Sequence, residues 1–331
     1  MSFADDHVRP LISNATQSQT EAILGAMRAV AGTGGPLSES DRIALESVDR
    51  CIFGHQRPFS LDEVATVSPA ALASALADSN LAEDAVKFIT VMAFVDGKLD
   101  KAKIAAVLAY ATALGIRAEY LDDIKIAAQD RLQESLAHMV RANMISITGQ
   151  PWNDGDVNAW LLPYSGDKAD PALAARFETL SRLDNDTFGH AFWAHFKENN
   201  YAFPGDPAGL NAKFSVPHDS AHVLTNYHTD PRGELLVSTF TASMHPKYPM
   251  AGHVLPVIFS WHLNVQINKV AKDAKGALDP REFWHAWAAG AAAKVDTFSP
   301  DWDFWSHVAK PLVALRAEWS IPPAGVDRLA Q

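Results

Sequence analysis

Apolar residues in the first 145 positions of the chain recur at helical spacing, with short polar stretches between the apolar runs. In residues 17–32 and 83–95 an apolar residue returns every three or four positions, which is typical of a helix with one buried face. The apolar positions of these two segments are Ile23, Leu24, Met27 and Val30, and Val86, Ile89, Met92 and Ala93. Alternation of apolar and polar residues, which would indicate a strand, is nearly absent. The pattern predicts an all-α fold.

Capping residues divide this part of the chain into separate helices. Ser38 or Ser40 can cap a helix over residues 43–51, because a serine oxygen accepts a hydrogen bond from the free N–H groups of the first turn. The sequence DGKLD at residues 96–100 predicts a turn, after which a helical stripe resumes. Gly115 is expected to end that helix, since glycine adopts the left-handed conformation without strain.

The second part of the chain has a different composition. All nine tryptophans occur at or after Trp152, and ten of the 13 histidines occur at or after His190. Between the two parts, residues 147–156 contain Gly, Pro, Asn and Asp without helical periodicity, which favours a linker. We therefore predict two helical domains, residues 1–146 and residues 147–331.

The helices on either side of the DGKLD turn carry a further pattern. In MAFVDGKLDKAKIAAVLAYATALGI the turn residues are Asp96, Gly97, Leu99 and Asp100. This pattern resembles the TerB-like (tellurite-resistance B type) helical domain over about residues 15–140, and in that family the acidic turn has been linked to cation binding. The alternative is a helix-capping turn in which Asp96 and Asp100 face water, because two carboxylates without further oxygen ligands make a poor calcium site.

Charge and cysteine content narrow the classes of protein to consider. A formal charge of −11 leaves no basic stripe to neutralise phosphates, so we expect no nucleic-acid partner. The single cysteine, Cys51, allows no intrachain disulfide, and the first residues carry acids where a secretory signal would carry basic residues. We expect a cytoplasmic protein. The charge does not exclude contact of a small apolar surface with the inner face of the membrane. The sequence is also compatible with a homo-oligomer.

The sequence VPHDSAHVLTNYHTDPRGEL concentrates groups that bind metals. Pro217 and Pro231 are each expected at the first position of a helix, where a missing N–H costs no hydrogen bond. His218 and His222 are four residues apart on the first helix, so their Cβ atoms lie roughly 5–6 Å apart on one face. The short loop before Pro231 makes the two helices antiparallel neighbours, which brings Glu234 opposite His222. The stretch therefore predicts a divalent metal site with three protein ligands from two helices.

Other residues of this part have less defined roles. Asp219, next to His218, is a candidate metal ligand, a residue that orients a histidine, or a catalytic base. His228 lies in the loop and is expected in solvent. Three protein ligands leave positions for water, oxygen or substrate, and the ligand set does not distinguish zinc, iron, cobalt and manganese. Polar core or surface positions are expected for His245, His253 and His262.

The motif has a counterpart in a known family. The spacing His218-Asp219-x-x-His222, followed after eleven residues by Glu234, resembles the signature of the Coq-four family, helical proteins of ubiquinone (coenzyme Q) biosynthesis. Segments on both sides resemble other parts of that family over about residues 155–325. They contain Thr187, Phe188 and Gly189 before the motif, and Trp302, Pro311, Leu312 and Arg316 after it.

The resemblance implies a metal-dependent role in quinone head-group modification, namely oxidative decarboxylation at the first ring carbon of a prenylated hydroxybenzoate. It also implies a complex with other quinone-biosynthesis proteins, and an apolar surface or tunnel for the polyprenyl tail. Apolar residues at helical spacing are available for that purpose: Leu255, Val257, Ile258, Phe259 and Trp261, and Phe283, Trp284 and Trp287.

Two other functions fit the same residues. One is a non-catalytic scaffold that binds prenylated lipid intermediates, presents them to other enzymes and uses the ion structurally. The other is a metal-linked stress-response protein in which the TerB-like half senses cations. A metal-dependent enzyme of quinone biosynthesis is the leading interpretation.

Overall fold

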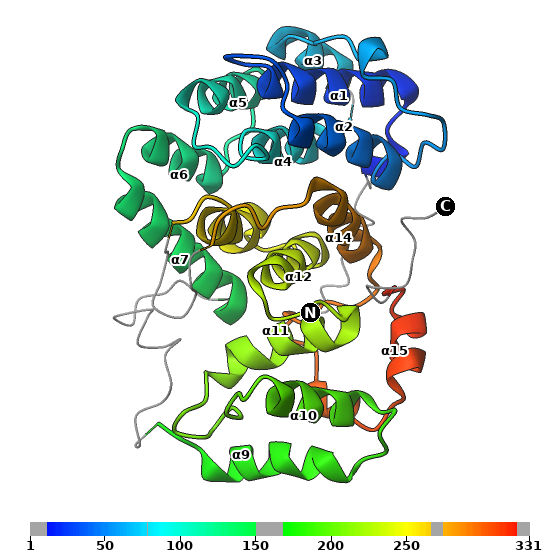
Figure 1. Cartoon of the computed structure of the whole chain (residues 1–331), viewed down its shortest axis with the longest axis vertical. Helices are drawn as coiled ribbons and strands as arrows, with labels where there is room; N and C mark the ends of the chain where they lie inside the picture. Colours follow the sequence, from blue (N-terminus) through cyan, green and yellow to red (C-terminus); the bar gives the residue numbers. More distant parts are fainter. Residues whose placement is uncertain (1–11, 78, 150–167, 266–273, 323–331) are drawn as a thin grey trace, which may run out of the picture. The chain divides into compact units, whose positions relative to one another are not determined.

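The computed structural model describes residues 12–77, 79–149, 168–265 and 274–322. In these residues the regular structure is helical, with two isolated β-bridges and no β-sheet (Figure 1). The predicted all-α fold is confirmed. None of the helices in these ranges is long and apolar enough to cross a membrane.

The chain divides into two compact units by its internal contacts. The first unit is Met1–Arg131 with Asp279–His285, and the second is Leu132–Leu278 with Ala286–Gln331. The domain boundary expected at residues 146–147 stays a prediction. Helix α7 (Leu132–Thr148) runs across that position, and residues 150–156 of the expected linker lie outside the described residues.

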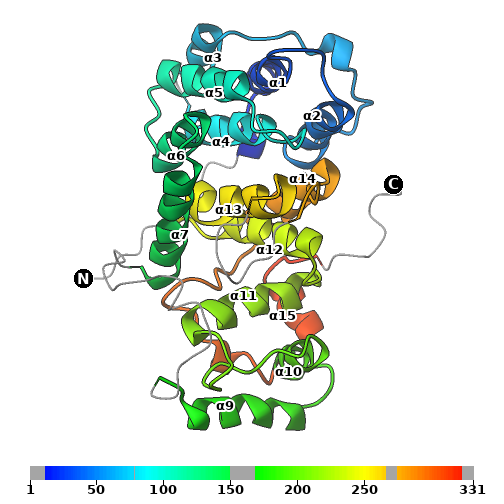
Figure 2. The same cartoon turned by 60° about the vertical axis from the view of Figure 1, so that its left-hand side comes forward.

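The first unit is a bundle in which α1 packs against α2, α3, α4 and α5 (Figure 2). Its helices are α1 (Gln17–Ala31), α2 (Glu39–Cys51), α3 (Pro69–Leu76), α4 (Ala82–Met92), α5 (Lys101–Ala113) and α6 (Glu119–Ala128), with the short turns η1 (Ile12–Asn14) and η2 (Leu61–Glu63). Ile23, Met27, Val86 and Ile89 are fully buried, as the helical stripes predict. Ser38, rather than Ser40, caps α2.

The acidic turn before α5 combines a helix cap with a buried ion pair. Asp100 caps α5 by accepting hydrogen bonds from the N–H groups of Ala102 and Lys103. The expectation that Asp96 faces water is wrong, because its Oδ2 atom lies 3.0 Å from the ammonium of Lys103 and its side chain is only 9% exposed. The same ammonium lies 3.8 Å from the carboxylate of Asp41, which is 1% exposed. The chain itself therefore supplies the positive charge beside these two acids.

The second unit contains α7, α9 (Pro171–Glu178), α10 (Phe188–Glu198), α11 (Ala212–Thr225), α12 (Pro231–Met244), α13 (Leu255–Val257) and α15 (Leu312–Glu318). The π-helical turns η4 (Pro249–Val254) and η5 (Ile258–His262) flank α13, and η3 (Thr179–Arg182) and η6 (Phe304–Ser306) are short 3₁₀ turns. The division between the units falls within α14 (Pro280–Ala292). In the second unit, α11 packs against α10 and α12, and α12 and α7 both pack against η4.

Helix α11, which carries the predicted histidine ligands, begins at Ala212, earlier than expected. Its cap is Asn211, whose side chain accepts a hydrogen bond from the N–H of Lys213, so the position predicted for Pro217 at the start of the helix is wrong. A proline inside the helix removes one hydrogen bond, here the one to the carbonyl of Lys213. Lys213 is exposed, so water is available to that carbonyl. The helical phase of the two histidines is unchanged.

An aromatic core and one arginine hold the surroundings of α11 in place. The aromatic members are at most 4% exposed, and their contacting rings have centroids 4.7–5.9 Å apart: Phe177, Phe188, Phe192, Phe196, Phe203 and Phe304. Arg316 on α15 donates hydrogen bonds of 2.8 and 2.9 Å to the carbonyl oxygens of Leu224 and Val223. These bonds fix the last turn of α11, from which His222 projects.

Candidate metal centre

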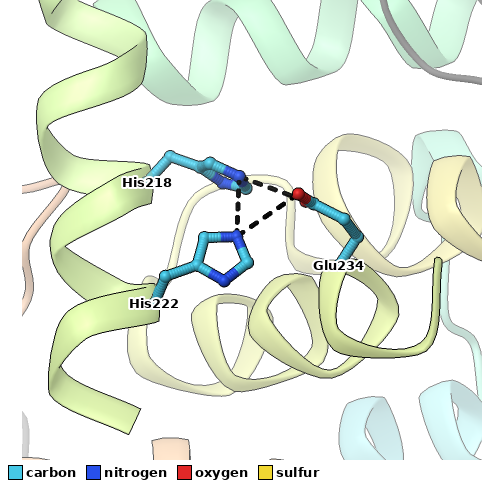
Figure 3. A group of neighbouring side chains, drawn as sticks. All are labelled: His218, His222 and Glu234. Carbon is cyan, nitrogen blue, oxygen red and sulfur yellow. Dashed lines mark hydrogen bonds and ion pairs between the residues drawn. The ribbon is translucent and has the colours of Figure 1, made fainter. Parts of the chain in front are cut away.

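Three side chains from α11 and α12 meet at one point (Figure 3). His218 and His222 lie one turn apart on α11, and their Nε2 atoms are 3.3 Å apart. Glu234 lies in the first turn of α12, with one carboxylate oxygen 3.2 Å from Nε2 of His218 and the other 3.4 Å from Nε2 of His222. The fold thus brings together the three residues that the spacing predicts as metal ligands.

A tight turn between the helices sets this arrangement. Asn226 ends α11 with a left-handed φ of 62°, and Asp230 caps α12 by accepting a hydrogen bond of 2.7 Å from the N–H of Gly233. Gly233 lies against the backbone of His228, and a Cβ atom at this position would be 1.9 Å from the carbonyl oxygen of His228. Glycine is therefore required there. The close approach places Glu234, the next residue, beside α11.

The imidazoles are oriented by neighbours outside the group. Nδ1 of His222 lies 2.9 Å from the carbonyl oxygen of Tyr227. Because a carbonyl only accepts hydrogen bonds, Nδ1 carries the proton, and a neutral His222 presents a lone pair at Nε2. The ring of His218 stacks on Phe214, with centroids 5.0 Å apart and planes inclined by 15°. The contacts with Tyr227 and Phe214 thus fix both imidazole rings.

The three groups influence one another's protonation. Burial would raise the pKa of Glu234, but the adjacent imidazoles of His222 and His218 outweigh burial and hold that carboxyl pKa well below its ordinary value. Burial would lower the pKa of His218, but its hydrogen bond to Glu234 outweighs burial and raises the pKa of His218 above its ordinary value. Glu234 is therefore a carboxylate at neutral pH. A cation that binds Nε2 of His218 competes with a proton for it.

The distances within the group fit a small divalent ion. An ion about 2.0–2.1 Å from each ligand atom, with tetrahedral angles, would hold those atoms about 3.3–3.4 Å apart. The two imidazole nitrogens are 3.3 Å apart, Nε2 of His218 lies 3.2 Å from one carboxylate oxygen of Glu234, and Nε2 of His222 lies 3.4 Å from the other. Two imidazole nitrogens and one carboxylate oxygen suit zinc, iron, cobalt and manganese alike, so the donor set does not select one metal.

A cavity of about 620 Å³ adjoins the group, and His218 and Glu234 form part of its wall. Most of the wall is apolar, with contributions from Met139, Val140, Phe214, Val257, Trp261 and Phe298. A cavity of this size suits a small organic ligand with an apolar body. Of the five apolar residues named on the predicted helix, Val257 and Trp261 line the cavity, whereas Leu255, Ile258 and Phe259 are fully buried in the core.

Asp219 lies beside the group of three without belonging to it. Its carboxylate is 2.9 Å from Nε2 of His195 on α10, and the ring of His195 stacks on that of His222 with centroids 5.5 Å apart. Among the roles expected for Asp219, these contacts favour that of a residue that orients a histidine, here His195, or of a base over that of a metal ligand. Sequence reasoning missed His195 because 24 positions separate it from Asp219 and no local pattern joins them. His228 is exposed and outside the group, in agreement with the prediction.

A second set of histidines lies in the interior of the same unit. Nδ1 of His245 is 2.8 Å from a carboxylate oxygen of Asp296, and Nε2 of His253 is 2.7 Å from the hydroxyl oxygen of Ser146. His245, His253 and His262 are at most 5% exposed. Of the two expectations for these residues, polar core or surface, the polar core is confirmed. Of these three, His253 also lines the cavity.

No protein-family model matches the chain, and no curated protein matches it either. The resemblance to the Coq-four and TerB-like families therefore depends on the motif residues named above.

Proposed function

We propose that the protein is a metal-dependent enzyme of ubiquinone biosynthesis that acts on a prenylated hydroxybenzoate. The observation that carries the proposal is the position of His218 and Glu234, two members of the metal-binding group, in the wall of a largely apolar cavity. Structural metal sites are closed by protein ligands, whereas catalytic sites keep a position for substrate. The pathway is supported by the spacing of the motif, which resembles the Coq-four signature.

The charges around the cavity suit a ligand with one anionic group and an apolar body. Among the described lining residues, the acids are Asp219 and Glu234, and none is a lysine or arginine. A divalent ion bound by two neutral imidazoles and one carboxylate keeps a single positive charge, which would attract a carboxylate or phenolate. A phosphorylated ligand would find no basic partner on this part of the wall. An aromatic acid with a prenyl tail meets both conditions.

The proposed reaction is an oxidative decarboxylation at the first ring carbon. The bond between that carbon and the carboxyl carbon breaks, carbon dioxide leaves, and a bond forms between the ring carbon and an oxygen atom from dioxygen. One aromatic acid and half a molecule of dioxygen thus give one phenol and one carbon dioxide. A divalent ion held by His218, His222 and Glu234 would supply a Lewis acid that stabilises negative charge on an oxygen of the substrate.

The chain's own residues orient the substrate and move its protons. Tyr227 fixes the imidazole of His222 and Phe214 fixes that of His218, so the group does not have to rearrange when the substrate arrives. Asp219 lies on the cavity wall, where its carboxylate is a candidate general base. The apolar wall excludes water from the ring carbon that reacts.

Substitution of His222 by alanine tests the proposal. His222 belongs to the metal-binding group but does not line the cavity, so the variant should lose the ion and keep the cavity wall. We expect turnover of a prenylated 4-hydroxybenzoate to fall at least about 100-fold, measured by mass spectrometry with ¹⁸O-labelled dioxygen. His228→Ala is the matched control, because it removes an exposed histidine of the same stretch. This control should keep both the ion and the turnover.

The same experiment separates the enzyme from a scaffold. A non-catalytic scaffold would bind the prenylated substrate in the wild-type protein without converting it, with or without the ion. Absence of labelled product from the metal-loaded wild type, or unchanged turnover in His222→Ala, would contradict the proposed enzyme. Association with other quinone-biosynthesis proteins and peripheral membrane contact are parts of the same proposal. Pull-down and vesicle co-sedimentation of the wild-type protein would test them.

A further inference from the structure

His253, on η4, is a polar residue of the cavity wall that has no role in the reaction proposed above. His253 is 5% exposed, and its Nε2 atom lies 2.7 Å from the hydroxyl oxygen of Ser146 on α7. The hydroxyl oxygen of Ser146 also lies 3.1 Å from the carbonyl oxygen of Lys247. These two contacts determine which nitrogen of the imidazole carries the proton.

The single hydrogen of the Ser146 hydroxyl goes to the carbonyl of Lys247, because a carbonyl has no hydrogen to donate. Ser146 therefore accepts a hydrogen bond from His253, and Nε2 of His253 carries the proton. Nδ1 then has a lone pair and is a hydrogen-bond acceptor. Within the described residues no protein group is bonded to it, so Nδ1 is the atom that His253 can offer to a ligand in the cavity.

The backbone that carries His253 is fixed against α7. The side-chain amide of Asn143 donates a hydrogen bond of 2.7 Å to the carbonyl of Gly252. A Cβ atom at Gly252 would lie 3.3 Å from the carbonyl oxygen of Ala142, so the two backbones are in close contact. The ring of Phe298 lies 5.6 Å from that of His253 and packs edge to face with it. The imidazole is therefore held in one orientation before a ligand enters.

The same surroundings keep His253 uncharged. Burial, together with the nearby His245 and His218, lowers the pKa of His253 to about 3. A neutral acceptor in an apolar wall favours a ligand that brings an uncharged donor, because a buried acceptor without a partner costs free energy. An O–H group on an aromatic ring is such a donor.

We propose that His253 is a specificity-determining residue, whose Nδ1 accepts a hydrogen bond from a hydroxyl group on the ligand. The apolar body of the ligand fills the space between this position and the group formed by His218, His222 and Glu234. The identity of the ligand as an aromatic acid rests on the proposed function, whereas the preference for a hydroxyl group rests on the contacts of His253 with Ser146. His253 positions the ligand and takes no part in bond breaking.

Binding of two probes tests this proposal without reference to turnover. The probes are 3-geranyl-4-hydroxybenzoate and 3-geranylbenzoate, which differ only in the hydroxyl group, and their dissociation constants are measured by calorimetry with the zinc-loaded protein. The wild type should bind the hydroxylated probe at least about ten-fold more tightly. His253→Phe should bind both probes equally, and His253→Gln, which keeps an acceptor oxygen, should recover part of the preference.

A variant of another polar lining residue serves as the control. Ser238→Ala removes a hydroxyl from the cavity wall and should keep the wild-type preference. Thermal unfolding of each variant shows whether it is folded, and Ser146→Ala, which frees the imidazole without removing it, should also reduce the preference.

Equal binding of the two probes by the wild type, binding of neither probe, or an unchanged preference in His253→Phe would overturn the proposal. If the wild type prefers the hydroxylated probe but neither it nor any variant converts either probe, the proposed function is contradicted. The proposed role of His253 in binding is then still supported.

Discussion

Alanine in place of Gly233 is expected to weaken metal binding, although Gly233 contributes no ligand. The new Cβ atom would lie 1.9 Å from the carbonyl oxygen of His228, whereas ordinary contacts begin at 3.4 Å, so the backbone has to yield by about 1.5 Å. Metal–ligand distances tolerate changes of only about 0.2 Å. Because Glu234 is the next residue, a shift of this size moves its carboxylate away from an ion held by the two histidines.

Gly233→Ala should lower both the affinity for the metal ion and the free energy of unfolding. Substitution of a residue that supports a metal ligand costs about 10–100-fold in affinity, and displacement of Glu234 itself should reach the upper end of that range. In the metal-free protein, crowding against His228 should lower the free energy of unfolding by about 1–3 kcal/mol. The higher helix propensity of alanine would offset about 1 kcal/mol of this loss.

Zinc titration in competition with a chromophoric chelator measures the affinity of Gly233→Ala, and urea unfolding of the metal-free protein measures its stability. Gly35→Ala is the matched control, since a Cβ atom at Gly35 meets nothing within 4 Å. It should leave both quantities unchanged. A wild-type zinc affinity in Gly233→Ala would refute the argument that the close approach of Gly233 to His228 positions Glu234.

Two further predictions concern charge. The pKa of His218 is raised above 6.5 in the metal-free protein, so its proton is held until the pH rises through that higher value. Zinc binding should therefore release more protons near pH 6.5 than at pH 9. Calorimetry in buffers of different ionisation enthalpy measures the release, and equal release at both pH values would contradict the raised pKa. Lys103→Met should lower the free energy of unfolding in urea by about 3–5 kcal/mol, because Asp41 and Asp96 lose their buried cation. Lys98→Met, at a side chain that is 74% exposed, should cost less than about 1 kcal/mol. Equal costs for the two variants would contradict the buried pair.

The parts of the site that could be predicted from the sequence are those encoded within a few residues. His218 and His222 are one helical turn apart, and Asp230 and Pro231 mark the start of the next helix, so the meeting of the histidines with Glu234 followed from helix geometry. The start of α11 was misplaced for a related reason. Pro217 is common at a first helical position, but Asn211 provides the cap, and one lost hydrogen bond near the start of a helix is tolerated.

The contacts that sequence reasoning missed mostly join residues that lie far apart along the chain. His195 reaches Asp219 across 24 positions, and His253 reaches Ser146 across 107 positions. Such pairs depend on how helices pack, which periodicity does not specify. The contact of Lys103 with Asp96 was missed for a different reason, since it spans only 7 positions. A lysine near an acidic turn is expected in solvent, and only the structure shows that this turn is buried.

The most direct test of the metal centre is a crystal structure of the zinc-loaded protein, with diffraction measured on both sides of the zinc absorption edge. We expect an anomalous peak about 2.0–2.2 Å from Nε2 of His218, from Nε2 of His222 and from a carboxylate oxygen of Glu234. Zinc-saturated crystals with no peak at this position, or with zinc held by other residues instead, would contradict the metal centre and the function proposed from it.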